Sequence, residues 1–152
     1  MMKMMSIVSY ALITKLILFT CTITSTIFVL SPFINGLGCN FVQENDSETY
    51  FQKGYCKSGI IIIETRDKIT GEVKIKKMLW GFWGGYNYTW HISTKIIKNG
   101  ENLKPSKFAL YSAYRVIAGY RIAGNLSSYW VYDQPFEVVY TTENKGRLGF
   151  FQ

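Results

Sequence analysis

The sequence predicts a mainly β protein. It has a hydrophobic N-terminal helix (residues 1–38) and an exported domain (residues 39–152) folded as a small antiparallel β-sandwich or half-open barrel, with α+β as the alternative class. Three observations lead to this prediction. The first 38 residues carry only two charges, Lys3 and Lys15. Several later segments alternate apolar and polar residues, which is typical of strands. Clusters of Gly, Asn and Asp separate these segments, as turns require.

The apolar segment has two interpretations that differ in length. If Lys15 closes a basic leader, the apolar run is Leu16–Leu30, fifteen residues, which is typical of a cleavable export signal. Pro32 would then break the helix, and Gly36 and Gly38 would offer a small-residue cleavage site. If the Lys15 side chain instead reaches the cytosolic interface, the span extends to Gly38 and covers roughly 23 residues, enough for an uncleaved membrane anchor.

Both interpretations give the same orientation. Lys3 and Lys15 precede the apolar segment, and the first charges after it are Glu44, Asp46 and Glu48. The positive-inside bias therefore places the N-terminus in the cytosol and the domain outside it, in a periplasmic, luminal or extracellular compartment. We expect a single-pass membrane protein if the segment is retained and a secreted protein if it is cleaved.

The charge of the chain points away from nucleic acid. Seventeen Lys and Arg residues against ten Asp and Glu give a formal net charge of +7. The basic residues are spread along the chain, apart from Lys74, Lys76 and Lys77, whereas nucleic-acid surfaces show a denser patch with a recognisable module. We expect the membrane and a protein partner or membrane complex as binding partners, with a glycan or lipid as alternatives.

The cysteines predict one disulfide. Cys21 lies in the apolar segment, so Cys39 and Cys56 are the two that remain in the exported domain. In an oxidising compartment such a pair is expected to form a bond, here closing a loop worth roughly 3 kcal/mol. Lipid modification of Cys39 is the alternative, although the preceding residues lack the leucine expected three places upstream.

Strands account for most of the domain. Residues 58–65 (SGIIIIET) are rich in β-branched side chains and fit a buried strand. Residues 66–71 fit a turn, and residues 72–78 (EVKIKKM) fit a second strand that forms a hairpin with the first. In the second strand Val73 and Ile75 share one face, and Lys74 and Lys76 share the other. In 86–97 the side chains of one face are Tyr86, Tyr88, Trp90 and Ile92.

The C-terminal third is less regular. Residues 108–122 fit a strand, with Arg115, Gly119 and Arg121 opposite an apolar face, but helical spacing fits as well; we favour the strand. Residues 129–142 form a strand that Pro135 can interrupt, and 144–152 (NKGRLGFFQ) indicate a loop or a short edge.

The main candidate binding feature is an aromatic run within LWGFWGGYNYTWH. Flat rings next to glycines can stack on sugars, lie at a membrane interface or anchor a protein partner, and they can equally fill a small core, which is the more common role. Its members are Trp80, Phe82, Trp83, Tyr86, Tyr88 and Trp90.

Catalytic and metal signatures are weak. His91 is the only histidine, and no GxSxG, HExxH or P-loop motif occurs. Glu64 and Asp67 could act as an acid–base pair, but they border a predicted turn and are better explained as solvated residues. We therefore expect no cofactor, no metal and no enzymatic activity, with a small hydrolase using His91 as the remote alternative.

Three sequons match the N-glycosylation pattern, at Asn45, Asn87 and Asn125, and they have meaning only if the source is eukaryotic.

The anchor, the aromatic run and the weak catalytic signatures together predict a membrane-anchored, extracytoplasmic, non-catalytic binding protein: an accessory subunit or an immunity-type inhibitor at the membrane surface. The alternative is a secreted carbohydrate- or lipid-binding module that uses the aromatic run as its platform.

Overall fold

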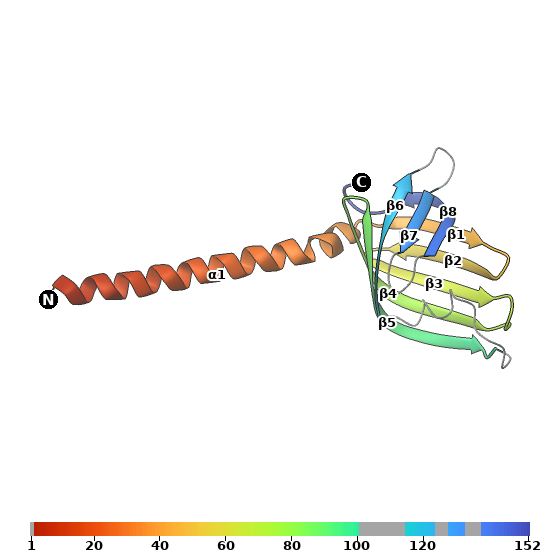
Figure 1. Ribbon diagram of the computed structural model, residues 1–152, viewed down its shortest axis with the longest axis horizontal. Helices are drawn as coiled ribbons and strands as arrows, with labels where there is room; N and C mark the ends of the chain where they lie inside the picture. Colours follow the sequence, from red (N-terminus) through yellow and green to blue (C-terminus); the bar gives the residue numbers. More distant parts are fainter. Residues whose placement is uncertain (1, 101–114, 124–127, 133–137) are drawn as a thin grey trace. The chain divides into compact units, whose positions relative to one another are not determined.

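A computed structural model describes residues 2–100, 115–123, 128–132 and 138–152. It contains one long helix and eight strands (Figure 1). In chain order these are α1 (Met2–Gly36), β1 (Asn40–Asp46), β2 (Tyr50–Lys57), β3 (Ile60–Asp67), β4 (Val73–Trp83), β5 (Tyr86–Lys98), β6 (Val116–Ala123), β7 (Ser128–Tyr132) and β8 (Val138–Arg147).

The helix α1 continues through Pro32, where the shorter interpretation predicted a break. Proline has no N–H for the carbonyl of Phe28, but the Ser31 hydroxyl donates a hydrogen bond to that oxygen at 2.8 Å. The hydroxyls of Thr20, Thr22, Thr24 and Thr26 donate hydrogen bonds to carbonyls one turn back in the same way, for example Thr22 to Leu18 at 2.7 Å. Leu12–Gly36 is therefore a 25-residue stretch long and apolar enough to span a membrane.

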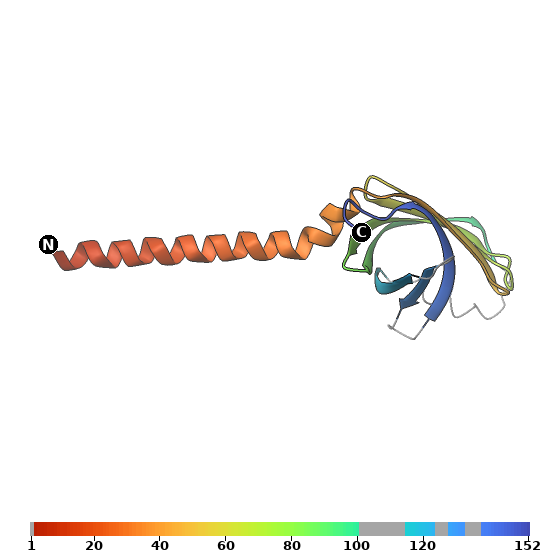
Figure 2. The ribbon, with the colours of Figure 1, turned by 90° about the horizontal axis from the view of Figure 1, so that it is seen from above.

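The eight strands form one closed antiparallel barrel (Figure 2). Each strand pairs with its neighbour in sequence, and β1 pairs with β8 to close the ring, with Gln43 opposite Asn144 and Phe41 opposite Gly146. The prediction of a mainly β, antiparallel fold is confirmed, and of the two predicted architectures the barrel is the one formed. It is closed rather than half-open because β8 extends along β1 over five residue pairs.

Most of the predicted strands are present. β3 and β4 form the expected hairpin, and β5 covers the predicted alternating segment. β6 shows that Val116–Ala123 is a strand and not a helix, whereas residues 101–114 lie outside the described part of the chain. In place of one strand over 129–142 there are two paired strands, β7 and β8, and Pro135 lies outside the described residues. β3 is not wholly buried, since Ile61 and Ile63 point inward and their neighbours lie half-buried on the outside.

Three strand segments were not predicted. β1 and β2 form a hairpin within the acidic segment after Cys39, and the residues Asn144–Arg147, expected as a loop or edge, complete β8. Polar residues such as Gln43 and Gln52 interrupt the apolar residues at their inward positions, so the sequence shows no regular apolar alternation there. Pairing with neighbouring strands, rather than local pattern, makes these segments extended.

The apolar core occupies one end of the barrel. Trp80 lies at its centre, with its ring centroid 5.0 Å from that of Phe41, 6.0 Å from Trp130 and 6.5 Å from Phe82. Its Nε1 donates a hydrogen bond of 2.8 Å to the carbonyl of Leu148, so the polar atom of this ring is satisfied inside the core. The chain after β8 is therefore held against the barrel by the same side chain.

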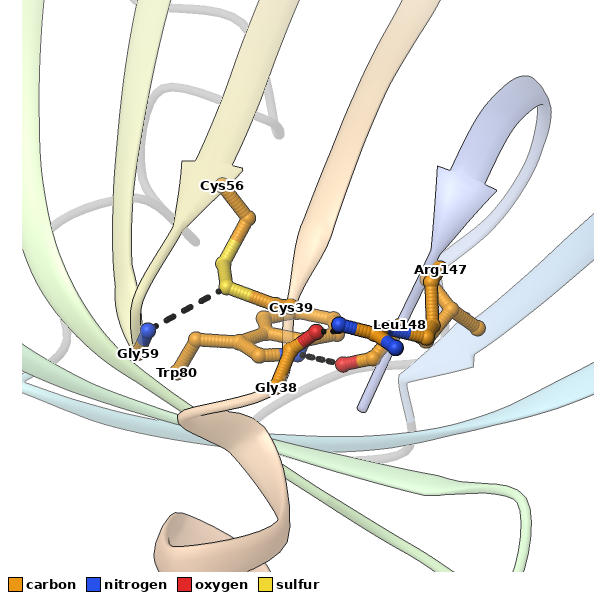
Figure 3. Close-up of a disulfide and its surroundings, with 7 residues drawn as sticks. All are labelled: Gly38, Cys39, Cys56, Gly59, Trp80, Arg147 and Leu148. Carbon is orange, nitrogen blue, oxygen red and sulfur yellow. Dashed lines mark hydrogen bonds between the residues drawn. A yellow bond between two sulfur atoms is a disulfide. The ribbon is translucent and has the colours of Figure 1, made fainter. Parts of the chain in front are cut away.

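The predicted disulfide joins Cys39 to Cys56 at this end of the barrel (Figure 3). Both cysteines are almost fully buried, and the Cys39 sulfur also accepts a hydrogen bond from the Gly59 N–H at 3.3 Å. The bond connects the residue before β1 to the penultimate residue of β2. Because the Cys39 sulfur is committed to this bond, the lipid-modified alternative is contradicted.

The chain divides into two compact units, residues 1–31 and 32–152. Residues 32–38, which the sequence grouped with the apolar segment, pack within the second unit. The buried Asn35 amide donates to the carbonyls of Phe82 (2.6 Å) and Phe151 (3.0 Å), and its oxygen accepts from the Phe151 N–H (2.7 Å). A Cβ at Gly36 would clash with the carbonyl oxygen of Trp80, so this approach requires glycine.

Candidate functional site: an aromatic outer wall and a polar barrel interior

The barrel separates the predicted aromatic run into two groups. Trp80 and Phe82 point inward and belong to the core. Trp83, Tyr86 and Trp90 point outward with about half of their surface exposed, at 48%, 52% and 54%, and Tyr88 is partly exposed on the same side. The six residues therefore do not form one platform: the inner pair stabilises the fold, and the outer four remain available for binding.

Neighbouring strands extend the outer group into a continuous surface, which we call the aromatic wall. Register places Trp83 beside Tyr86 and Tyr86 beside Tyr120, whose rings lie 6.1 Å apart. Ile122 pairs with Tyr129 on the next strand. The wall comprises the outward side chains of β4 to β7, namely Leu79, Trp83, Tyr86, Tyr88, Trp90, Tyr120, Ile122 and Tyr129.

The members of the wall on β6 and β7 were missed by sequence reasoning. The apolar face predicted for residues 108–122 includes Tyr120 and Ile122, and these two side chains do lie on one face of β6. This face is exposed, however, and Gly119 on the opposite face is buried. A Cβ at Gly119 would come within 2.6 Å of the Tyr132 ring, so the inner space there is already filled. The alternating pattern reveals which side chains share a face of the strand, but not whether that face points into the barrel or toward solvent.

The aromatic wall is confined to one side of the barrel. The outer face of β1–β3 carries charged pairs instead, with Lys53 2.6 Å from Glu44 and Arg66 3.9 Å from Glu64. Beside the wall the exposed charges are basic, at Lys77 and Lys95. An apolar surface bordered by positive charge on one side of a domain is typical of a binding face.

The interior of the barrel is unusual because much of it is polar. Along each of β1 to β4 the inward side chains change from apolar to polar in the same direction through the barrel. On β4, Trp80 and Met78 are followed by Lys76, which is only 7% exposed. The lysine face predicted for this strand therefore points inward. The buried polar residues of these strands and of β8 are Gln43, Asn45, Gln52, Thr65, Asp67, Lys76 and Thr142.

Burial lowers the pKa of Lys76 to about 8, with repulsion from Lys74 as a second cause and attraction to Glu72 as a partial compensation. In the unfolded chain the pKa returns to its ordinary value of 10.5. Between these two values the unfolded chain binds more protons than the folded chain, so the free energy of unfolding should rise with pH.

We expect the folded protein to gain roughly 2 kcal/mol from this group as the pH rises from about 8 toward 10, allowing for partial solvent screening. The Lys76→Gln variant should lose this gain, whereas Lys77→Gln should keep it because Lys77 is exposed. Urea denaturation at a series of pH values measures the difference. The window ends near pH 10 because burial raises the pKa of Tyr50 above its ordinary 10.0, which has the opposite effect on stability. Parallel pH profiles for the two variants would contradict the assignment.

The remaining candidate residues are not brought together. His91 Nε2 lies 2.7 Å from Thr94 Oγ1 on its own strand. Glu64 points outward toward Arg66, while Asp67 is buried and accepts hydrogen bonds from the backbone N–H groups of Ile69 and Thr70. Glu64 and Asp67 thus lie on opposite faces of β3 and do not form an acid–base pair. Within the described ranges no three His, Cys, Asp or Glu residues are grouped to hold a metal.

Two of the three sequons lie inside the barrel. Asn87 is fully buried and donates to the Tyr132 hydroxyl at 3.1 Å, and the buried Asn45 faces the Tyr50 hydroxyl at 3.3 Å. A glycan on either amide would not fit the folded barrel, so the glycosylation hypothesis is not supported at these two positions. Asn125 lies outside the described residues.

Comparison of the chain with protein families, with curated proteins and with solved structures gives no match. Function is therefore inferred from the residues themselves.

Proposed function

We propose that this protein is a membrane-anchored, extracytoplasmic binding protein without catalytic activity, which engages a protein partner through the aromatic wall. The part of the apolar helix that precedes the barrel unit, residues 12–31, serves as the anchor, and Lys3 and Lys15 set the N-terminus in the cytosol. The Cys39–Cys56 disulfide fits an oxidising compartment for the barrel.

Retention of the anchor, rather than cleavage, is supported by the contacts of residues 35–38. Cleavage before Cys39 would remove Asn35 and its three hydrogen bonds to the barrel. It would also remove the Gly38 carbonyl, which accepts a hydrogen bond of 2.9 Å from Arg147 Nε (Figure 3). Since buried donors and acceptors that lose their partners each cost about 1–3 kcal/mol, a cleaved chain would have a weakened barrel end.

The single observation that supports binding is the clustering of exposed tryptophan and tyrosine side chains on the aromatic wall. These side chains combine a large apolar area with few rotatable bonds, and they dominate the energetics of protein interfaces. The basic residues beside the wall, Lys77 and Lys95, favour a partner whose apolar surface is bordered by acidic groups. An anchored domain meets such partners in or near the same membrane, as an accessory subunit or an inhibitor does.

Site-specific photo-crosslinking in native membranes tests this proposal. A photoreactive phenylalanine analogue at Trp90 or Tyr129 should give an adduct of the same mass, because both positions belong to the wall. The same analogue at Tyr55, an exposed tyrosine on the outer face of β2, should give no such adduct. The Trp90→Ala variant should bind the crosslinked protein with affinity lower by roughly 30-fold, as for an interface hot spot.

A matching adduct from Tyr55, or adducts of unrelated mass from the two wall positions, would argue against a defined partner. A chain that elutes alone in mild detergent at its own mass, with no adduct from either wall position, would refute the proposal. Mass spectrometry of the native N-terminus tests the anchor separately: a start at Met1 or Met2 is expected, and a start near Cys39 would contradict it.

A further inference from the structure

The polar interior of the barrel has no role in the function proposed above. Its inward side chains form rows that cross neighbouring strands. Inward residues of neighbouring strands lie side by side in register: Asn144 beside Gln43, and Ile63 beside Lys76. In the next row Asn45 lies beside Gln52, and Gln52 beside Thr65. Five strands thus contribute polar side chains to one region of the interior.

Several polar atoms in this region have no hydrogen-bond partner in the part of the chain that the structure describes. They are Gln52 Oε1, Thr142 Oγ1 and both side-chain amide atoms of Asn144, and Gln52 and Thr142 are only 5% and 2% exposed. Folded proteins satisfy nearly all buried polar atoms, because each unpaired one is costly. Acceptors and a donor are both represented, so a complementary molecule must carry hydrogen-bond donors as well as acceptors.

The same region holds a positive charge that has no counter-ion among the described residues. Lys76 is buried, and among the described residues no carboxylate lies within ion-pair distance of its ammonium group. The nearby Glu72 is paired with Lys74 at 3.2 Å, and Asp67 has its Oδ1 bonded to backbone N–H groups of the following turn. A buried cation without a partner is unfavourable for folding, so a bound anion would stabilise the protein.

We propose that the polar part of the barrel interior binds a small anion that also carries hydroxyl groups, of the hydroxycarboxylate or sugar-phosphate class. Lys76 is its charge partner, and Gln52, Thr142 and Asn144 form its hydrogen bonds. The interior of an eight-stranded barrel is either filled by side chains or holds one small ligand, and the unpaired polar atoms and the buried ammonium favour a ligand here. Carboxylate and phosphate oxygens are the groups that a lysine ammonium binds as a point charge, and hydroxyls supply the donors that the free acceptors require. The site is separate from the aromatic wall, which lies on the outer face.

Ligand-dependent thermal unfolding of the full chain in detergent tests the proposal, with citrate, glucose 6-phosphate, inorganic phosphate and glucose as probes. Citrate or glucose 6-phosphate should raise the Tm of the wild type saturably, and neutral glucose should not. The Lys76→Gln variant should bind the effective anion at least about tenfold more weakly. Lys77→Gln, the neighbouring exposed lysine, should behave as the wild type.

A second measurement does not depend on a folded variant. Acylation of lysines in the wild type, followed by mass spectrometry, should show that the effective anion protects Lys76 and leaves Lys77 unchanged. A Tm that rises with inorganic phosphate as much as with the hydroxylated anions would remove the hydroxyl requirement and overturn the ligand class. The absence of a saturable shift with every anion, equal shifts in the two lysine variants, or unchanged acylation of Lys76 would overturn the site.

Discussion

Replacing Trp80 by alanine should lower the free energy of unfolding by about 3–5 kcal/mol, the largest effect expected from a single side chain in this protein. The Trp80 ring contacts three other aromatic rings in the core, and its Nε1 holds the Leu148 carbonyl. Alanine would leave a cavity at the centre of the core and an unpaired buried carbonyl. Because the described core residues form a single cluster around Trp80, its loss affects all of them together.

Trp83 provides a matched control three residues further along β4. Its side chain is about half exposed on the outer face, so Trp83→Ala should change the free energy of unfolding by roughly 0.5–1 kcal/mol. Urea denaturation followed by far-ultraviolet circular dichroism compares the two without relying on tryptophan fluorescence. Trp80→Phe separates packing from hydrogen bonding, since it keeps most of the ring area. Equal losses for Trp80→Ala and Trp83→Ala would contradict the assigned inward and outward positions.

The Cys39–Cys56 disulfide should have the second largest effect. The double variant Cys39→Ser/Cys56→Ser should lose roughly 3 kcal/mol of stability, because the crosslink restricts a loop of the unfolded chain. The two cysteines also connect the start of β1 to the end of β2, next to the buried contacts of Asn35. Loss of the bond is therefore expected to weaken the barrel where the anchor joins it.

Cys21 serves as the control for this experiment, since it is exposed on α1 and forms no disulfide. Cys21→Ser should leave the denaturation midpoint unchanged, while the double variant should unfold at markedly lower urea. The native protein should resist mild reductant, because both bonded sulfurs are almost fully buried. A denaturation midpoint in the double variant equal to that of the wild type would show that the crosslink adds no stability.

Local sequence signals predicted the elements whose formation depends mainly on residues close together in the sequence. The long apolar run predicted α1, and the two cysteines after it predicted the disulfide by elimination. Alternation predicted β5 and the β3–β4 hairpin. The helix end was wrong in the shorter interpretation, because the Ser31 hydroxyl takes the place of the N–H that Pro32 lacks.

The candidate site was predicted only in part. The aromatic run was identified, but its division into core rings and wall rings was not, and Tyr120 and Tyr129 were not joined to it. The polar interior was invisible in the sequence, because Gln43, Gln52 and Lys76 look like solvated residues of exposed strands. Their burial depends on closure of the ring by strands from both ends of the domain.

The sequence by itself determined most of the extended segments and which residues share a face, and its flanking charges predict which side of a membrane the domain occupies. It did so because these properties depend on neighbouring residues, on the period of the strand and on flanking charge. Only the tertiary structure decided which face points inward. Pairing of β1 with β8, between residues about one hundred positions apart, closes the barrel and turns Lys76 inward and Trp90 outward. A two-residue period is the same for either choice, so no local pattern contains this information.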